Sequence, residues 1–381
     1  GTMCAQEDYH IRNFGRNDEL KTRGTIRLTQ INGFMWIGTS EGFFAFDGNH
    51  MHKYTIPDED GLGGWFGCVT SLAAAPDSSL WVGSRRGIYH FYMDEERLEK
   101  FTAKDLPDSP DVAQLLFDKE GHLWSIMNGK VYKIDLKTKK VECVGEGLAS
   151  PRCMTLTKKG TMWLGDNEGI LYRYDSHTHR LRSYNVKPEN VESFTEIVSI
   201  TEMRNGQLAL VSVNDGVALF SPEKYTSKML LTHDDEGARM VSHTSVTPDG
   251  DNLWIGTERG VIIYRMRDGH VKGIRQSRHS VNSLSDNSVH SLYVDHENGV
   301  WAGTYFGGTD RISLSPHNFT VHMPEDEDVD VVREILGDHF EHLWVGTEDG
   351  GLYLFNRDDG SLREANLDWG GNPRPFNGKL S

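Results

Sequence analysis

The chain has 381 residues, of which 37% are hydrophobic and 25% charged, a composition that supports a packed core and excludes a disordered chain. Its net charge of -16 argues against a nucleic-acid partner, because proteins bind nucleic acids mainly through cationic contacts to phosphate. No run approaches the roughly 18 apolar residues that a membrane-spanning helix needs, so a soluble chain is expected.

The first predicted element is a β-strand over residues 9–14, and a second strand follows over residues 25–31. From there a short motif recurs, in which an apolar pair that usually contains Trp precedes an aliphatic residue and Gly. Complete copies centre on Trp36, Trp81, Trp163, Trp254, Trp301 and Trp344, and degenerate copies centre on Trp124 and Ala209. The eight copies are spaced by about 44 residues, and seven of the nine tryptophans share this register.

Four short β-like runs occur within each period. Around Trp163 they cover residues 153–159, 162–166, 170–175 and 181–186. Around Trp301 they cover 289–295, 300–304, 309–314 and 319–323, with an Asn298-Gly299 hairpin turn between the first two. Four strands in a period of roughly 40–45 residues are typical of a β-propeller blade. The repeats therefore predict an all-β propeller, with the tryptophans packed between neighbouring blades.

The number of blades in the ring depends on the partner of strand 9–14, which could close the ring and remove exposed strand edges. Pairing with 309–314 gives a seven-bladed propeller over residues 8–318. The eighth repeat, 319–367, then begins a second propeller, and residues 368–381 form a tail. Pairing near residues 352–357 gives an eight-bladed ring instead. The seven-bladed ring is favoured.

The repeat around Trp301 carries further residues that resemble a known family. It reads NSLSDNSV over 282–289, then Asp295, Gly299 and VWAGTYFGG over 300–308. This combination resembles the two-component regulator propeller repeat, which fills the periplasmic sensor region of hybrid two-component systems in Bacteroides-type bacteria. The resemblance extends from about Asp8 to about Asn366, although the copies around Trp124 and Ala209 depart from it.

The resemblance implies a sensor in which propellers precede a further β-domain, a membrane helix, and cytoplasmic histidine-kinase and response-regulator modules. This chain would then be the periplasmic, ligand-sensing part of such a protein. The implied partners are a glycan or other small molecule, the second propeller and β-domain of the same protein, and a second copy in a dimeric receptor. The kinase motifs are absent from this chain, so the segment itself is not expected to be an enzyme.

Ligand-binding residues are expected on one face of the ring. Blade geometry places the turns between second and third strands on the same face as the connections between blades, and such loops commonly carry function. Aromatic rings, Arg, Asn and carboxylates there suit sugar rings and their hydroxyl or acidic groups. The candidates are Trp65, Phe66, Arg85, Arg86, Asn167, Glu168, Asn214, Asp215, Glu258, Arg259, Tyr305 and Phe306. The Arg85-Arg86 pair would suit an acidic sugar, or would only neutralise neighbouring loops such as Ser40-Glu41.

No catalytic residue, metal ligand or cofactor is predicted. Residues 38–42 fit G-x-S-x-G but lie between two strands, whereas a nucleophile elbow needs a strand-to-helix turn. His177 and His179 lie in a predicted turn with no third ligand nearby in the sequence, and the four cysteines lack metal-site spacing. The acidic stretch 325–330 lacks the glycine of a calcium loop. Sensing of an oligosaccharide-like ligand is the favoured function, and a scaffold for protein assembly or a glycan-cleaving propeller enzyme are the alternatives.

Overall fold

A computed structural model gives the fold, and its described residues are 9–14, 24–57, 67–108, 110–145, 148–277, 282–313, 332–338, 342–347, 351–356, 362–368 and 373–375. Trp65, Phe66 and the predicted stretches 319–323 and 325–330 lie outside these ranges. Contacts divide the chain into two compact units. The larger contains Tyr9–Gln276 and Ser283–Ser315, and the smaller contains Gly1–Asp8, Ser277–Asn282 and Pro316–Ser381. Within the described ranges, the chain has no helix that could cross a membrane.

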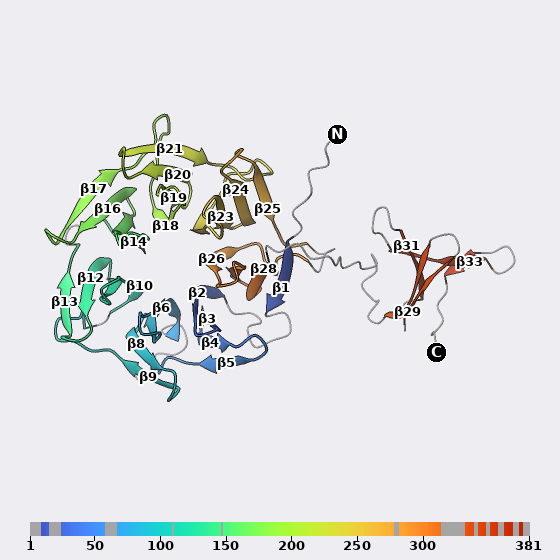
Figure 1. The fold of residues 1–381 in the computed structure, drawn as a ribbon, viewed down its shortest axis with the longest axis horizontal. Coiled ribbons are helices and arrows are strands. Elements are labelled where there is room, and N and C mark those ends of the chain that lie inside the picture. The colour runs from blue at the N-terminus through green and yellow to red at the C-terminus, as the bar shows by residue number, and fades with distance from the viewer. Residues whose placement is uncertain are drawn as a thin grey trace. The chain divides into compact units, whose positions relative to one another are not determined.

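Among the described residues of the larger unit, seven four-stranded antiparallel sheets follow one another around a ring (Figure 1). The first sheet contains β2 (Thr25–Ile31), β3 (Phe34–Thr39), β4 (Gly42–Phe46) and β5 (Met51–Tyr54). The second contains β6 (Val69–Ala74), β7 (Leu80–Ser84), β8 (Gly87–Tyr92) and β9 (Arg97–Lys100). The third contains β10 (Val112–Phe117), β11 (Leu123–Met127), β12 (Lys130–Asp135) and β13 (Lys140–Cys143).

The remaining four sheets continue the same order. The fourth contains β14 (Pro151–Leu156), β15 (Met162–Asp166), β16 (Ile170–Asp175) and β17 (Arg180–Asn185). The fifth contains β18 (Ile197–Glu202), β19 (Leu208–Ser212), β20 (Gly216–Ser221) and β21 (Thr226–Leu231). The sixth contains β22 (Ser242–Val246), β23 (Asn252–Thr257), β24 (Gly260–Arg265) and β25 (Val271–Ile274). The seventh contains β26 (Val289–Val294), β27 (Val300–Thr304), β28 (Thr309–Ser313) and, at its outer edge, β1 (His10–Phe14).

The prediction of an all-β propeller with four-stranded blades is confirmed, and the repeated motif forms the second strand of each sheet. The degenerate copies also form strands, β11 and β19. Second strands are almost wholly buried, because neighbouring sheets cover both of their faces. Fourth strands such as β9 are largely exposed at the rim.

The ring is closed by β1, which is the first strand of the chain and lies beside β28 in Figure 1. His10 is opposite Ser313 and Phe14 is opposite Thr309, so the pair is antiparallel along its whole length. The innermost strands β26 and β2 also contact each other, so the seventh sheet packs directly on the first. Phe14 contributes to this joint by stacking on Trp301 and contacting Phe46 of β4.

The second-strand tryptophans of the ring pack between neighbouring sheets, as predicted. Trp36 contacts Phe91 of the second sheet, and Trp163 contacts Phe220 of the fifth. Trp254 belongs to a buried cluster that continues into the seventh sheet, and Trp301 belongs to one that continues into the first. These large side chains therefore carry apolar contact from each sheet to the next.

Asp295 organises the turn between β26 and β27. Its carboxylate accepts hydrogen bonds from the backbone N–H of Glu297 and Gly299, from Trp301 Nε1 at 2.8 Å and from Arg311 Nε at 2.7 Å. Burial opposes the ionisation of Asp295, but the hydrogen bonds from Arg311 and Trp301 outweigh it and lower the pKa of the carboxyl group. One acidic side chain thus joins the turn, the buried tryptophan and β28.

Gly169 → Ala should lower the free energy of unfolding by more than the roughly 1–3 kcal/mol that positive φ alone costs an alanine, since the added Cβ also clashes with the backbone. Gly169 has φ +80°, and a Cβ would lie 1.9 Å from the Phe194 carbonyl oxygen. Gly206 has the same φ, with nothing within 4 Å of a Cβ, so Gly206 → Ala isolates the conformational part of the cost. Urea denaturation of both variants measures the difference. Equal losses would mean that the close approach to Phe194 contributes nothing.

The smaller unit contains a further four-stranded sheet, formed by β29 (Val332–Gly337), β30 (Leu343–Thr347), β31 (Leu352–Phe355) and β32 (Leu362–Glu364). β33 (Asn366–Asp368) and β34 (Pro373–Pro375) pair with each other within the region predicted as the end of the repeat and a tail. Val332, Ile335 and Leu336 of β29 are exposed, whereas the first strands of the ring bury most of their apolar side chains.

Candidate functional site

The turns between second and third strands lie on the same face as the connections between sheets. The backbone N–H of Asn128 donates to the Asp111 carbonyl, Glu258 N–H to Val241, and Tyr305 N–H to Ser288. In each case a turn is tied to the connection that enters its own sheet. The structure therefore brings together the loops that the sequence analysis assigned to one face, which we call the loop face.

The first strands of all seven ring sheets are irregular where they leave the loop face. In β22 the pairing register shifts between Ser242 and Thr244, and in β26 it shifts between Val289 and Ser291. The extra residue is His243 in one strand and His290 in the other. Because a β-bulge changes the direction of a side chain, the irregularity gives two adjacent sheets an imidazole at the same position.

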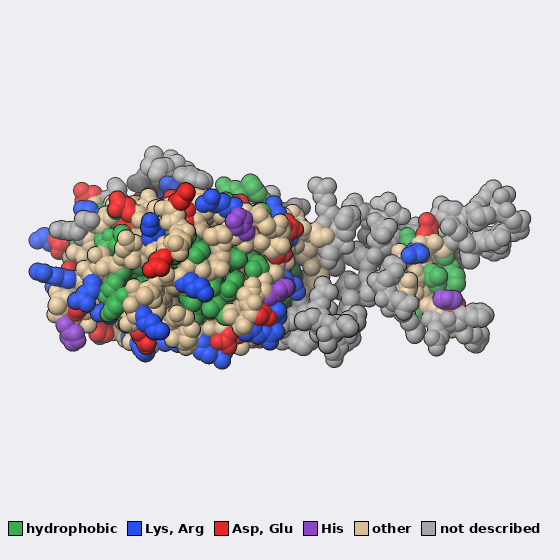
Figure 2. Space-filling model, turned by 90° about the horizontal axis from the view of Figure 1, so that it is seen from above, with side chains coloured by type: hydrophobic (Ala, Val, Ile, Leu, Met, Phe, Trp, Pro, Cys, Tyr) green, Lys and Arg blue, Asp and Glu red, His purple; other side chains and the backbone are tan. Residues whose placement is uncertain are grey.

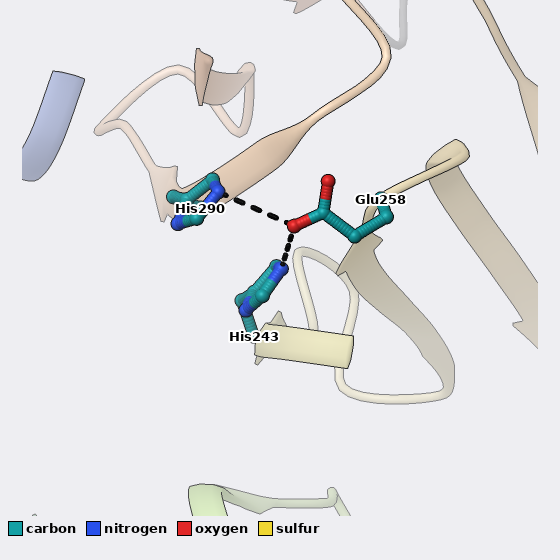
Figure 3. Close-up of side chains that lie close together, drawn as sticks. All are labelled: His243, Glu258 and His290. Atoms are coloured by element: carbon teal, nitrogen blue, oxygen red, sulfur yellow. Dashed lines mark hydrogen bonds and ion pairs between the residues drawn. The ribbon is translucent and has the colours of Figure 1, made fainter. Parts of the chain in front are cut away.

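Glu258, in the turn between β23 and β24, lies against both imidazoles (Figure 3). Its Oε1 is 2.6 Å from His243 Nε2 and 3.5 Å from His290 Nε2. Ser288 Oγ donates to Glu258 Oε2 at 2.7 Å and lies 3.0 Å from His290 Nε2. The two imidazole rings stack, with centroids 4.2 Å apart and planes at 12°. We call His243, Glu258, Ser288 and His290 the histidine cluster.

The surroundings set the charges of the histidine cluster at neutral pH. Burial opposes the ionisation of Glu258, but hydrogen bonds from Ser288 and His243 outweigh it and lower the pKa of the carboxyl group. Burial, followed by repulsion from His243, lowers the pKa of the His290 imidazole. A carboxylate is therefore held beside a neutral imidazole.

Aromatic rings continue outward from the histidine cluster. The Tyr305 ring lies 5.3 Å from that of His290, and the Phe306 ring packs edge-on against Tyr305 at 4.5 Å. Tyr305 is 49% exposed and Phe306 is 69% exposed. Together with the stacked imidazoles they form a row of four rings, which we call the aromatic row. The row gives the loop face an apolar surface beside hydrogen-bonding groups.

The geometry is unlike that of a serine hydrolase triad. In such a triad the serine and the carboxylate lie at opposite nitrogens of the histidine. Here Ser288 and Glu258 both lie at Nε2 of His290, so the carboxylate does not orient a base toward the serine. Instead, Ser288 Oγ and Glu258 Oε1 both face the same nitrogen, Nε2 of His290.

Three predicted ligand-binding residues meet at this position: Glu258 belongs to the histidine cluster, and Tyr305 and Phe306 to the aromatic row. Arg259, next to Glu258, has structural partners, because it binds Asp234 and Glu236 of the connection between β21 and β22. Its position in an ion-pair network explains its presence without a ligand.

The other predicted residues lie on turns of other sheets. Arg86 is buried and donates to the Pro57 carbonyl, so it ties its turn to a connection between sheets. Asp215 accepts hydrogen bonds from Ser193 and Thr195 and serves a similar purpose. Arg85, Asn167, Glu168 and Asn214 are exposed. The structure does not gather these residues into the histidine cluster.

The opposite face carries a second group of acidic and histidine side chains, Asp118, Glu120 and His122. Asp118 accepts hydrogen bonds from the backbone N–H of Glu120 and His122 and from Trp124 Nε1. Asp338 binds His342 and Trp344 in the same way in the smaller unit. Asp118 is therefore part of a recurring turn, like Asp295, and its oxygens are already engaged.

Acidic and basic side chains are interspersed over the part of the larger unit that Figure 2 shows. The net charge of -16 is not gathered there into a single acidic region. Charge alone therefore marks no binding surface in that view, and the side-chain cluster of the loop face is the more specific feature.

Residues 283–306 match the family model described as "Two component regulator propeller". The chain carries a two-component regulator propeller repeat. This repeat covers β26 and β27 and includes Ser288, His290, Tyr305 and Phe306. It therefore supplies part of both the histidine cluster and the aromatic row.

The structure is also similar to solved propellers. The extracellular domain described for the hybrid two-component system BT4673 of B. thetaiotaomicron matches with a TM-score of 0.67 and 15% identity, over 95% of this chain and 55% of that one. The corresponding domain of BT3049 from the same organism gives 0.66 and 21%, over 93% and 49%. A catalytically inactive virginiamycin B lyase from Staphylococcus aureus gives 0.63 and 12%, over 81% and 100%. No curated protein sequence matches the chain. The chain spans about half the length of the two-component domains, and these likenesses show the fold alone.

Proposed function

We propose that this chain is an extracytoplasmic, ligand-sensing segment of a hybrid two-component sensor, and that its signal is an oligosaccharide-like molecule. The observation that carries the ligand class is the exposed aromatic row beside Glu258 on the loop face. A flat ring can cover the apolar face of a sugar, while a carboxylate and imidazoles hydrogen-bond to its hydroxyls. The segment itself performs no chemistry in this proposal.

The place in a sensor is supported by the two-component regulator propeller repeat and by the similar extracellular domains. Because the chain spans about half of those domains, we propose that the sheet β29–β32 is the first blade of a second propeller. Its exposed Val332, Ile335 and Leu336 are the kind of side chains that neighbouring blades would cover. We also propose that the full-length receptor is a dimer.

Tyr305 → Ala should weaken glycan binding by roughly thirtyfold. An aromatic side chain that buries about half of its 150–250 Å² against a sugar contributes about 2 kcal/mol at ~25 cal/mol per Å². The 381-residue chain would first be screened on an array of plant and host polysaccharide fragments. The tightest ligand would then be titrated by calorimetry into the wild type and into Tyr305 → Ala and Phe306 → Ala.

Tyr225 → Ala is the matched control, because Tyr225 is 52% exposed but lies in the turn between β20 and β21, away from the loop face. Its affinity should equal that of the wild type. Equal affinity of all variants would place the ligand elsewhere on the ring. Absence of binding to any glycan would contradict the ligand class, and chromatographic cleavage products would contradict a purely sensory role.

A further inference from the structure

We infer that His243, Glu258 and His290 bind a divalent transition-metal ion of the Zn²⁺ class. Two imidazole nitrogens and one carboxylate oxygen form a ligand set typical of such ions, and three protein ligands leave a position open for water or another oxygen ligand. The inference is independent of the glycan proposal, since a metal ion can occupy the histidine cluster whether or not a sugar binds the aromatic row.

The ligand atoms are close enough to share one ion. One ring nitrogen of His243, one ring nitrogen of His290 and a Glu258 carboxylate oxygen all lie within 4.8 Å of one another. Metal–ligand bonds of about 2.0–2.2 Å place tetrahedral ligand atoms about 3.3 Å apart. The separation between Glu258 Oε1 and His290 Nε2 is 3.5 Å, which already fits. The 2.6 Å separation from His243 Nε2 has to lengthen by less than 1 Å.

Metal binding also requires the imidazole rings to move. An ion lies in the plane of each imidazole that binds it, so rings stacked at 12° must tilt until their planes converge. The cluster allows this, because the side chains of His243, Glu258 and His290 are 22%, 42% and 32% exposed. Loss of the stacked arrangement is therefore a structural consequence of metal binding.

Ser288 supports the ligand set from outside it. It donates to Glu258 Oε2 and leaves Oε1 directed at the two imidazoles, as partners of metal-binding carboxylates commonly do. Asp118, Glu120 and His122 are the other such group among the described residues, but the backbone and Trp124 already occupy the Asp118 oxygens. By contrast, the hydrogen bonds described above to the Glu258 carboxylate come from the side chains of His243 and Ser288 and not from backbone N–H groups.

The test is Zn²⁺ binding to the 381-residue chain after removal of metals with a chelator. Calorimetry should give one Zn²⁺ per chain, and Co²⁺ should develop the visible absorption bands of a tetrahedral site. His243 → Ala, His290 → Ala and Glu258 → Gln should each weaken Zn²⁺ binding by at least about 100-fold, since even loss of an outer partner commonly costs 10–100-fold. Circular dichroism would verify that each variant is folded.

Two controls locate the ion. Glu168 → Gln removes an exposed carboxylate from the equivalent turn between β15 and β16, and it should leave Zn²⁺ binding unchanged. His122 → Ala should also leave it unchanged. Zn²⁺ binding that is lost in His122 → Ala but retained in His243 → Ala would overturn the assignment. Absence of Zn²⁺ and Co²⁺ binding to the wild type would overturn it as well.

Discussion

Phe14 → Ala should lower the free energy of unfolding of the ring by about 3–5 kcal/mol, the usual cost of truncating a buried phenylalanine. Phe14 is buried, stacks on Trp301 with ring centroids 5.2 Å apart, and lies 4.8 Å from the Phe46 ring. Its loss leaves a cavity where the seventh sheet meets the first. Urea denaturation, followed by tryptophan fluorescence, measures the change.

Phe34 → Ala is the control for this prediction, because Phe34 is an exposed phenylalanine at the start of β3. It should cost clearly less than Phe14 → Ala, since Phe34 is 38% exposed whereas Phe14 is 4% exposed, so less apolar area is lost from the core. An equally small loss for Phe14 → Ala would mean that the packing of β1 contributes little to closure. Phe46 → Ala, which leaves β1 unchanged, should lower the free energy of unfolding by an amount similar to Phe14 → Ala, because the two rings contact each other.

Asp295 → Ala should cost about 3 kcal/mol, the low end of the range found when one partner of a buried ion pair is removed, because Arg311 is 25% exposed and keeps Glu297 as a second partner. The substitution leaves the Arg311 guanidinium without the carboxylate that its Nε contacts at 2.7 Å. It also leaves the Trp301 indole N–H and the backbone N–H groups of the turn without their acceptor. Urea denaturation at neutral pH measures the loss.

Asp118 → Ala tests the same turn without the arginine. Asp118 accepts hydrogen bonds from Trp124 and the turn backbone, and its basic neighbours are the His122 imidazole at 3.0 Å and Lys133 at 3.9 Å, with no arginine, so its removal should cost less than that of Asp295. The Asp295 effect should also depend on pH. A carboxyl group whose folded pKa is lowered stabilises fully above its unfolded pKa, about 3.9, and this stabilisation is lost as the pH falls through the folded value. A difference between wild type and Asp295 → Ala that does not shrink in acid would contradict this account.

The repeat predicted the blades well because each blade is a local unit. The hairpin turns and the buried tryptophan strand follow from residues within one period, so strands such as β2 and β15 begin and end where the sequence indicated. The strand that closes the ring was harder to predict from the sequence, because only Ile11 and Phe14 of β1 are buried. A strand with two buried side chains fits many sheet edges, and the choice of β28 is made by backbone pairing and by the packing of Phe14.

His243, Ser288 and His290 of the histidine cluster were not predicted, because His243 and His290 are far apart in the chain and each residue looks ordinary by itself. His177 and His179 are close in sequence, but no third ligand lies near them in the chain. His243 and His290 occupy the same place in consecutive periods, each as the second residue of a first strand. Superimposing the periods on one another would have revealed the histidine pair beside Glu258, which the sequence already placed among the ligand-binding candidates.

The pairing of β1 with β28 has a mechanical consequence. His10 and Ser313, where the chain enters one strand and leaves the other, lie opposite each other at the same end of the pair. A force that pulls these two points apart acts across the hydrogen bonds, so it breaks them one after another from this end. It does not shear the two strands past each other along their whole length, which would load all the hydrogen bonds together. Phe14, opposite Thr309, is at the far end and separates last. The ring thus resists tension at this seam through backbone hydrogen bonds that are loaded one at a time and through the buried side chains of Ile11 and Phe14.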